Sequence, residues 1–271
     1  MSVEIAWLGH ATADIRMGGT RVLTDPLLRD RVAHLRRHNG TSVLGAHAFD
    51  SPVSGHSDPA ATGRHGVSGD VDVVVISHLH HDHLDLPSIR QLGAGTVVVV
   101  PRGAARLVAG HAKGEIIEIS SGEDIRVGQT LITAVPAEHH PGRFMSRVKA
   151  EPLGFVMEHE DGVVYFPGDT DLHPVMGDLP APDVALLPIW GWGRTLGDKH
   201  LDPGRASQAA SMLRARSVLP IHWGTFAPLG IRRRPPVWLS RSAEVFTESL
   251  ARHSPETRLE LKTPGPDLIS F

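Results

Sequence analysis

The chain has 271 residues, of which 41% are hydrophobic and 21% are charged, and its formal net charge is -3. This length can bury the core of one large domain, and the charge balance creates no field that would favour nucleic acid. There is no cysteine, so any metal site must be built from His, Asp and Glu. No stretch approaches the roughly 20 apolar residues of a membrane-spanning helix, and the N-terminus lacks a basic segment followed by an apolar run. We therefore expect a cytoplasmic protein without a nucleic-acid partner or stable membrane insertion.

Three short strands are predicted at the start of the chain, at 3–8, 13–17 and 21–24. Gly-Gly at 18–19 predicts a tight hairpin, and Pro26 ends the third strand. His10 and Asp25 each follow a strand, so both could lie beside a site built at strand ends. Residues 28–70 show poor periodicity and many Gly, Ser, Pro and His residues. They predict a loop insertion that is either a lid beside the site or a surface loop.

The motif Ser-His-Leu-His-His-Asp-His-Leu-Asp at 77–85 directly follows an apolar, β-branched run at 71–76. Such a run is typical of a strand buried on both faces. In extended backbone His78 and His80 point to the same side, and a turn can bring Asp82 and His83 close to them, while His81 points away. Imidazoles together with carboxylates are ligands that borderline divalent metals prefer. The motif therefore predicts a metal site, and the alternative is a solvated His-rich loop.

The rest of the chain alternates strands and helices, and several strands end in polar residues. Strand ends are followed by His139 and His140, by Asp169, by Trp190 and by His222, and Asp202 begins a helix just after His200. The predicted strands lie at 95–101, 115–119, 129–135, 153–158, 163–166, 184–187, 218–221 and 258–261. The predicted helices lie just after residue 85 and at 102–109, 204–213 and 239–253.

The motif at 77–85 resembles the signature of the metallo-β-lactamase superfamily. The stretches at 7–12, 23–26, 136–139 and 220–226 resemble one branch of it, which holds the N-acylphosphatidylethanolamine phospholipase D-like and ascorbate-phosphate lactonase-like proteins. The resemblance spans nearly the whole chain and implies a single domain over 1–271. Its α/β fold would be an αββα sandwich of two mixed sheets flanked by helices, with halves at about 1–135 and 136–271.

The resemblance also implies a set of seven ligands for two divalent metal ions. The first site would take His78, His80, His139 and Asp169, and the second would take Asp82, His83, Asp169 and His222. His140 competes with His139, and Asp171 competes with the bridging Asp169. Ligands of this kind fit zinc, with manganese and iron as alternatives. Asp25 would orient a ligand His or cap a turn.

A family member with this site would use a metal-bridging hydroxide to hydrolyse a phosphodiester or a related phospho-ester. Asp82 would orient the nucleophile or accept its proton, and His200 would lie near the substrate. His10, Arg143 and Trp190 are expected to contact the substrate, and Arg143 with the arginines at 232–234 indicates an anionic small molecule. The alternatives are a lactonase or carboxylic-ester hydrolase with the same site, and a non-catalytic metal or ligand binder. The sequence leaves homo-oligomerisation open.

Overall fold

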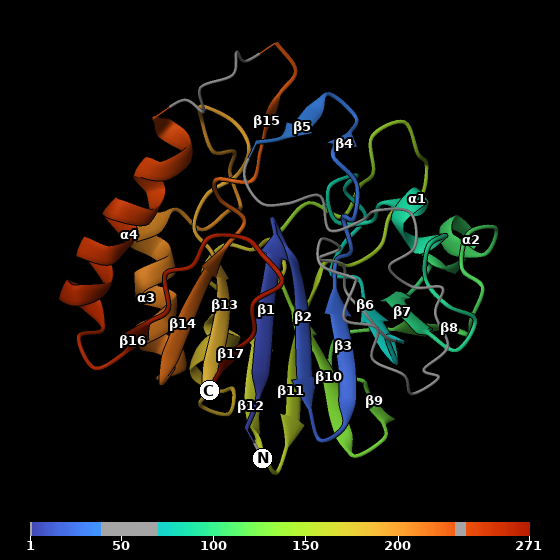
Figure 1. Cartoon of the computed structure of the whole chain (residues 1–271), viewed down its shortest axis with the longest axis horizontal. Coiled ribbons are helices and arrows are strands. Elements are labelled where there is room, and N and C mark those ends of the chain that lie inside the picture. The colour runs from blue at the N-terminus through green and yellow to red at the C-terminus, as the bar shows by residue number, and fades with distance from the viewer. Residues whose placement is uncertain (1, 39–69, 231–236) are drawn as a thin grey trace, which may run out of the picture.

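The computed structural model of the chain describes residues 2–38, 70–230 and 237–271, and it contains two seven-stranded sheets (Figure 1). In the first sheet the strand order is β17-β1-β2-β3-β6-β7-β8. Strands β1 to β3 pair antiparallel, with the turn between β2 and β3 at Gly18 and Gly19 in the left-handed region, whereas β3, β6, β7 and β8 run parallel. The strands are β1 (Glu4–Gly9), β2 (Thr12–Met17), β3 (Thr20–Thr24), β6 (Val73–Val75), β7 (Val97–Pro101), β8 (Ile116–Ile119) and β17 (Ile269–Ser270).

The second sheet has the order β16-β14-β13-β12-β11-β10-β9. Its first four strands in the chain pair antiparallel, and the pairs from β12 to β16 are parallel, so both sheets are mixed. The strands are β9 (Asp124–Val127), β10 (Thr130–Pro136), β11 (Leu153–His159), β12 (Gly162–Phe166), β13 (Val184–Pro188), β14 (Ser217–Ile221) and β16 (Arg258–Leu259).

The main core lies between the two sheets. Ile5, Ile15 and Val99 of the first sheet pack there with Phe155 and Leu186 of the second. Helices cover the outer faces, with one pair on each side of the sandwich (Figure 1). The helices are α1 (Leu86–Ile89), α2 (Ala105–Val108), the short 3-10 helix η1 (Pro174–Gly177), α3 (Pro203–Leu213) and α4 (Trp238–His253). This confirms the predicted αββα sandwich. As predicted, Asp85 and Asp202 cap α1 and α3 by accepting backbone N–H bonds.

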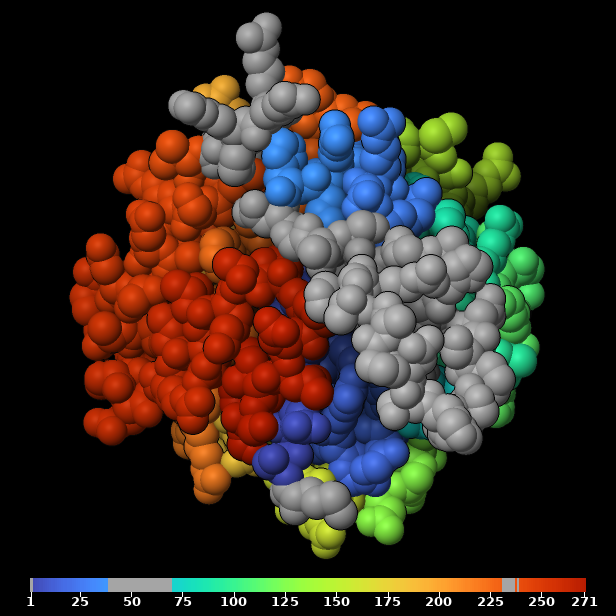
Figure 2. Space-filling view, viewed as in Figure 1, coloured from blue at the N-terminus to red at the C-terminus, as the bar shows by residue number. Residues whose placement is uncertain are grey.

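A third, small sheet lies at one end of the sandwich, beyond the ends of the main strands. It consists of β4 (Arg31–Val32), β5 (Leu35–Arg37) and β15 (Phe226–Pro228), in the order β15-β5-β4. The light-blue atoms of the N-terminal segment that holds the hairpin lie at this end of the molecular surface, beside orange C-terminal atoms (Figure 2). The prediction of a loop over residues 28–70 is therefore wrong for residues 31–37, whereas residues 39–69 lie outside the described residues. Strands this short carry no periodic signal, and β5 pairs with a strand far along the chain.

The boundary between the two sheets does not fall at residue 135, where the two expected halves of the chain meet. Strands β9 and β10 belong to the second sheet, and β17 returns from the C-terminal end to the edge of the first, beside β1. Within the described ranges, none of the helices has both the length and the apolar character needed to cross a membrane.

Candidate metal centre

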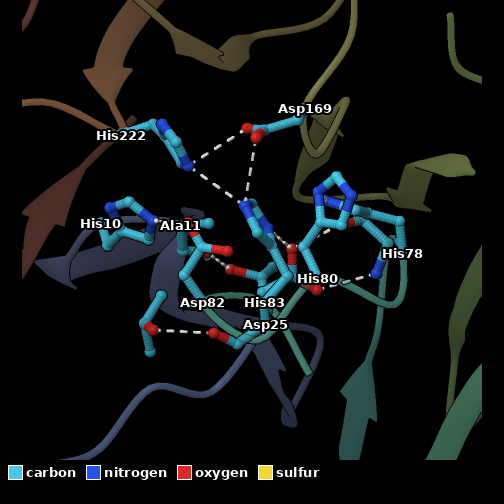
Figure 3. Close-up of polar contacts among 12 residues, drawn as sticks. His10, Ala11, Asp25, His78, His80, Asp82, His83, Asp169 and His222 are labelled. Carbon is cyan, nitrogen blue, oxygen red and sulfur yellow. Dashed lines mark hydrogen bonds and ion pairs between the residues drawn. The ribbon is translucent and has the colours of Figure 1, made fainter. Parts of the chain in front are cut away.

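Five polar segments meet at one end of the sandwich because the strands that carry them end there (Figure 3). The segment 77–85 follows β6, and His10 follows β1 in the first sheet. In the second sheet, His139 follows β10, Asp169 follows β12 and His222 follows β14. Both sheets therefore contribute side chains to one cluster.

The first group consists of three imidazoles. His78 Nε2 lies 3.0 Å from His80 Nδ1, and His139 Nε2 lies 3.1 Å from the same atom. All three ring nitrogens lie close enough to share one cation. His78 and His139 are buried, whereas His80 is partly exposed toward a cavity.

The second group is built from both sheets. His83 Nε2 lies 3.0 Å from His222 Nε2, and Asp82 Oδ2 lies 3.0 Å from His10 Nε2. These four residues form a second set whose ligand atoms are close enough to hold an ion. His10 is therefore part of this group, and its ring packs against that of His222 at a tilt, with 3.8 Å between centroids.

Asp169 lies between the two groups. Its Oδ1 is 3.2 Å from His222 Nε2, and its Oδ2 is 3.3 Å from His83 Nε2 and 3.5 Å from His200 Nε2. It also forms a possible ligand set with His139 and His200. Asp169 Oδ1 is buried and accepts no hydrogen bond from any residue that the structure describes. Such an orphaned anionic oxygen is costly unless a cation compensates it.

The hydrogen bonds behind the candidate ligands place a hydrogen on Nδ1 of three imidazoles, as assigned from the network. His83 Nδ1 donates to Asp25 Oδ2 at 2.6 Å, His222 Nδ1 to the Trp190 carbonyl at 2.7 Å and His139 Nδ1 to the Lys199 carbonyl at 3.0 Å. When such a ring is neutral, its Nε2 carries a lone pair that points into the centre.

A fourth imidazole is fixed by a relay through Ser77. The Ser77 hydroxyl donates to Asp25 Oδ2 at 2.5 Å, so its oxygen accepts from His78 Nδ1 at 2.9 Å. The Ser77 backbone N–H also donates to Asp25, at Oδ1. The fully buried Asp25 carboxylate therefore controls a ligand His in each group, which agrees with the orienting role expected for it.

Lone pairs that face each other at about 3 Å repel unless a cation or a proton lies between them. His83 and His222 present such a pair when both rings are neutral, and in the first group the Nε2 atoms of His78 and His139 both face His80 Nδ1. Together with the orphaned Asp169 oxygen, this donor set fits divalent cations that accept nitrogen and oxygen ligands.

The protonation of the metal-free centre agrees with this geometry. Burial lowers the pKa of His139 to about 4 and that of His222 to about 3. Burial opposes protonation of His83 as well, but the carboxylates of Asp169 and Asp25 raise its pKa well above the ordinary value. Burial opposes ionisation of Asp169, yet His222 and His83 hold its pKa well below the usual range. Without a metal, a proton on His83 therefore takes the position of the cation.

The competing ligand candidates point elsewhere. His140 lies 3.4 Å from the exposed Asp198, and Asp171 accepts from Arg205 at 2.6 Å. Neither belongs to a possible ligand set among the described residues, in contrast to His139 and Asp169. His81 does line the cavity beside the centre, although the alternation of strand side chains predicted that it would point away.

Two of the expected substrate contacts have other partners. Arg143 Nη1 donates to the carbonyls of Leu79 and Leu84, so this side chain holds the ligand loop and does not line the cavity. Trp190 bonds through its Nε1 to the Gly193 carbonyl and lies outside the lining, where its neighbour Trp192 is found instead. The arginines at 232–234 lie outside the described residues. His10 and His200 are both at the centre, as described above.

The cavity above the two groups has a volume of about 550 Å³, within the range of small-molecule sites. Its floor is formed by His80, Asp82, Asp169, His200 and His222. An αββα sandwich with a His- and Asp-lined cavity at its strand ends is the architecture of a metal-dependent hydrolase.

Comparison with known proteins agrees with this class. The profile described as "Beta-lactamase superfamily domain" matches residues 20–223. A "UPF0173 metal-dependent hydrolase" of Nitratidesulfovibrio vulgaris is 31% identical over 274 residues, which cover 99% of this chain and 95% of the relative. The chain belongs to the beta-lactamase superfamily and, within it, to the metal-dependent hydrolases.

Two further similarities are more distant. The "N-acyl-phosphatidylethanolamine-hydrolyzing phospholipase D 1" of Caenorhabditis elegans is 29% identical over 244 residues, covering 83% of this chain and 64% of that protein. The solved structure of Igni18, a metallo hydrolase from the archaeon Ignicoccus hospitalis, aligns with a TM-score of 0.68 at 22% identity. It covers 100% of this chain and 99% of that one, and at this identity it supports the fold alone.

Proposed function

We propose that the chain is a dinuclear metal hydrolase that cleaves a phosphodiester or a related phospho-ester. One ion would be held by His78, His80, His139 and Asp169, and the other by Asp82, His83, Asp169 and His222. The observation that carries the proposal is the convergence of bare imidazole nitrogens in two groups, with the orphaned carboxylate oxygen of Asp169 between them. Ligands of nitrogen and oxygen only are consistent with zinc.

Two such ions, when bound, supply Lewis acidity toward the substrate and a water that ionises near neutral pH. The residues of the chain supply orientation. His10 donates to Asp82 Oδ2, which leaves Asp82 Oδ1 free to orient a water or to take its proton. His200 is turned toward the cavity floor because its Nδ1 donates to the Asp198 carbonyl at 2.7 Å. Burial opposes protonation of His200, but Asp169 raises its pKa, and the protonated ring can donate from Nε2 to a substrate oxygen.

The phosphodiester preference rests on the similarity to the phospholipase D of Caenorhabditis elegans, whose name states cleavage of such a bond. Two divalent ions beside two carboxylates would leave a net positive charge, which favours a phosphodiester with its one negative charge. A lactone or carboxylic ester is the second candidate, and the absence of Lys and Arg from the described cavity lining favours it. Both reactions use the same nucleophile.

The test is hydrolysis of bis(p-nitrophenyl) phosphate and of a lactone panel by protein loaded with zinc or manganese, alongside metal analysis. Neighbouring residues provide matched controls. We expect His139→Ala and Asp169→Asn to lower metal affinity and turnover more than about 100-fold. His140→Ala and Asp171→Asn should stay within about twofold of wild type.

Opening of lactones without cleavage of any phosphodiester would select the second candidate. Stoichiometric metal with background turnover on both substrate classes would indicate a metal-binding protein. A metal content of one ion per chain would refute the dinuclear assignment.

A further inference from the structure

The cavity above the centre has a polar floor and apolar walls. The hairpin β4–β5 contributes Val32 and Leu35, the segment after β13 contributes Trp192 and Leu196, and Phe144 comes from the loop after β10. These side chains belong to three separate parts of the chain, yet all of them border the same space. The walls therefore enclose whatever part of a substrate extends away from the centre.

The wall is held in place by contacts of its own. Trp192 packs against a buried cluster formed by Leu27, Val32, Leu35 and Phe226, and its ring meets that of His34 edge-on, with 4.9 Å between centroids. The hairpin is tied to the core by the buried Arg37 guanidinium, which donates to the carbonyls of Leu8 and Leu27. The apolar wall is thus preformed and does not depend on a ligand for its order.

Three nearby cations are engaged elsewhere. Arg143 donates to two carbonyls of the ligand loop, Lys199 pairs with Glu138 at 2.7 Å and Arg205 with Asp171 at 2.6 Å. No Lys or Arg is found in the lining formed by the residues that the structure describes. A charged group placed against this wall would lose its hydration without gaining a partner.

Phe144 extends the wall to the mouth of the cavity. It is 78% exposed, and the adjacent Met145 is 92% exposed. His81 Nε2, which lines the cavity, is 3.3 Å from the Phe144 carbonyl and donates to it. These two adjacent apolar side chains form a surface beside the cavity that an apolar ligand could cover.

We infer that the substrate carries an uncharged, apolar substituent beside the scissile ester, which packs between Trp192, Leu196 and Phe144. The inference rests on the proposed hydrolase function for the position of the ester, which is the cavity floor. It replaces the further anionic group expected from Arg143, because no Lys or Arg is found among the described residues that line the cavity. The cavity volume of about 550 Å³ limits the substituent to a small-molecule group.

The first test is a series of p-nitrophenyl alkyl phosphates with methyl, butyl and hexyl chains, and the corresponding carboxylic esters. We expect kcat/KM to rise by about fourfold for each methylene that the wall buries. A chain of the same length that ends in a carboxylate should lose this gain. Equal rates along the series, or a preference for the carboxylate, would overturn the inference.

The second test does not need turnover. Binding of the neutral dye N-phenyl-1-naphthylamine to metal-free protein should weaken about tenfold or more in Phe144→Ser and in Leu196→Lys, because each removes apolar contact. Leu196→Lys should also improve binding of a carboxylate-ended chain. Leu261→Ser, at a position that is 46% exposed and outside the cavity, is the matched control and should bind as wild type does.

The two tests separate the two proposals. Dye binding that depends on Phe144 and Leu196, in a protein inert toward every ester, would refute the hydrolase and leave the apolar site standing. Turnover with dye binding that is equal in wild type and both wall variants would refute the apolar site alone.

Discussion

Replacing Asp25 with Asn should weaken both proposed metal sites without removing any of their proposed ligands. Asn has nearly the same shape as Asp, and the Ser77 backbone N–H can only donate, so the amide oxygen must remain at the Oδ1 position. The amide NH2 then occupies the position of Oδ2, which now accepts from both His83 Nδ1 and the Ser77 hydroxyl. A donor would replace an acceptor at the point where two hydrogen bonds end.

Both partners must reverse in response. His83 Nδ1 has to accept, which moves its hydrogen to Nε2, the atom that faces the centre. Ser77 Oγ has to accept as well, so its own hydrogen turns toward His78 Nδ1 and the hydrogen of that ring also moves to Nε2. One substitution therefore blocks one nitrogen in each group.

The magnitude follows from the hydrogen bonds that metal binding would have to break. Returning either ring to the binding tautomer leaves a buried polar group unpaired, which costs about 1–3 kcal/mol. Each ion should therefore bind about 10- to 100-fold more weakly, in line with the usual effect of losing a partner behind a metal ligand.

The assay is competition with a chromophoric chelator, combined with long-range proton–nitrogen NMR of the metal-free protein to read the His tautomers. Asp14→Asn is the matched control, because Asp14 is equally buried but accepts from Arg21 and contacts no ligand. If Asp25→Asn held both ions as tightly as the control, or kept hydrogen on Nδ1 of both rings, the tautomer argument would be refuted.

Three further predictions concern the support of the centre. Arg143→Ala should lower metal affinity about tenfold and the free energy of unfolding by about 1–3 kcal/mol, because two carbonyls of the ligand loop lose their donor; chelator competition and urea unfolding measure both. Gly168→Ala should destabilise by about 2–4 kcal/mol, because a Cβ would lie 2.4 Å from the Ser77 Cβ at a positive φ. Metal-free protein should lose about 2–3 kcal/mol between about pH 7.5 and 5.5, since the unfolded chain takes up protons that the buried His139 and His222 refuse.

The sign of the pH effect follows from the direction of each shift. Four imidazoles of the centre have lowered pKa values and destabilise the fold as the pH falls below about 6.5. Two others have raised pKa values and stabilise the fold over the same range. The net loss of stability therefore corresponds to two imidazoles. A flat urea midpoint across this pH range would contradict the assignment. Gly19→Ala, at a positive φ with open space around it, is the control for Gly168→Ala and should cost only about 1 kcal/mol.

Much of the centre could be predicted because each ligand follows an apolar strand. The runs before His78, His139, Asp169 and His222 are continuous enough to locate the strand ends, and the resemblance to a family joined these ends into one site. Asp25 was also found this way, since it ends β3 next to β6.

What the sequence could not supply is the direction of side chains in irregular loops. Backbone angles in these loops decide that Trp192 and not Trp190 lines the cavity, and that Arg143 turns toward carbonyls. The periodicity of the sequence does not predict such angles. His81 lines the cavity because the chain turns directly after His80, where strand alternation no longer applies. The hairpin at 31–37 is stabilised by pairing with β15, a partner that is distant in sequence.

The placement of the ligands on both sheets has a consequence for how the molecule assembles. His78 extends from the first sheet, whereas His139 and His222 extend from the second, so an ion bound by either group fastens one layer to the other. Neither group is complete until the layers have docked, so the proposed sites could hold an ion only after the two sheets have come together. A tightly held ion would then link the two sheets of the finished sandwich and slow their separation at the end that holds the centre.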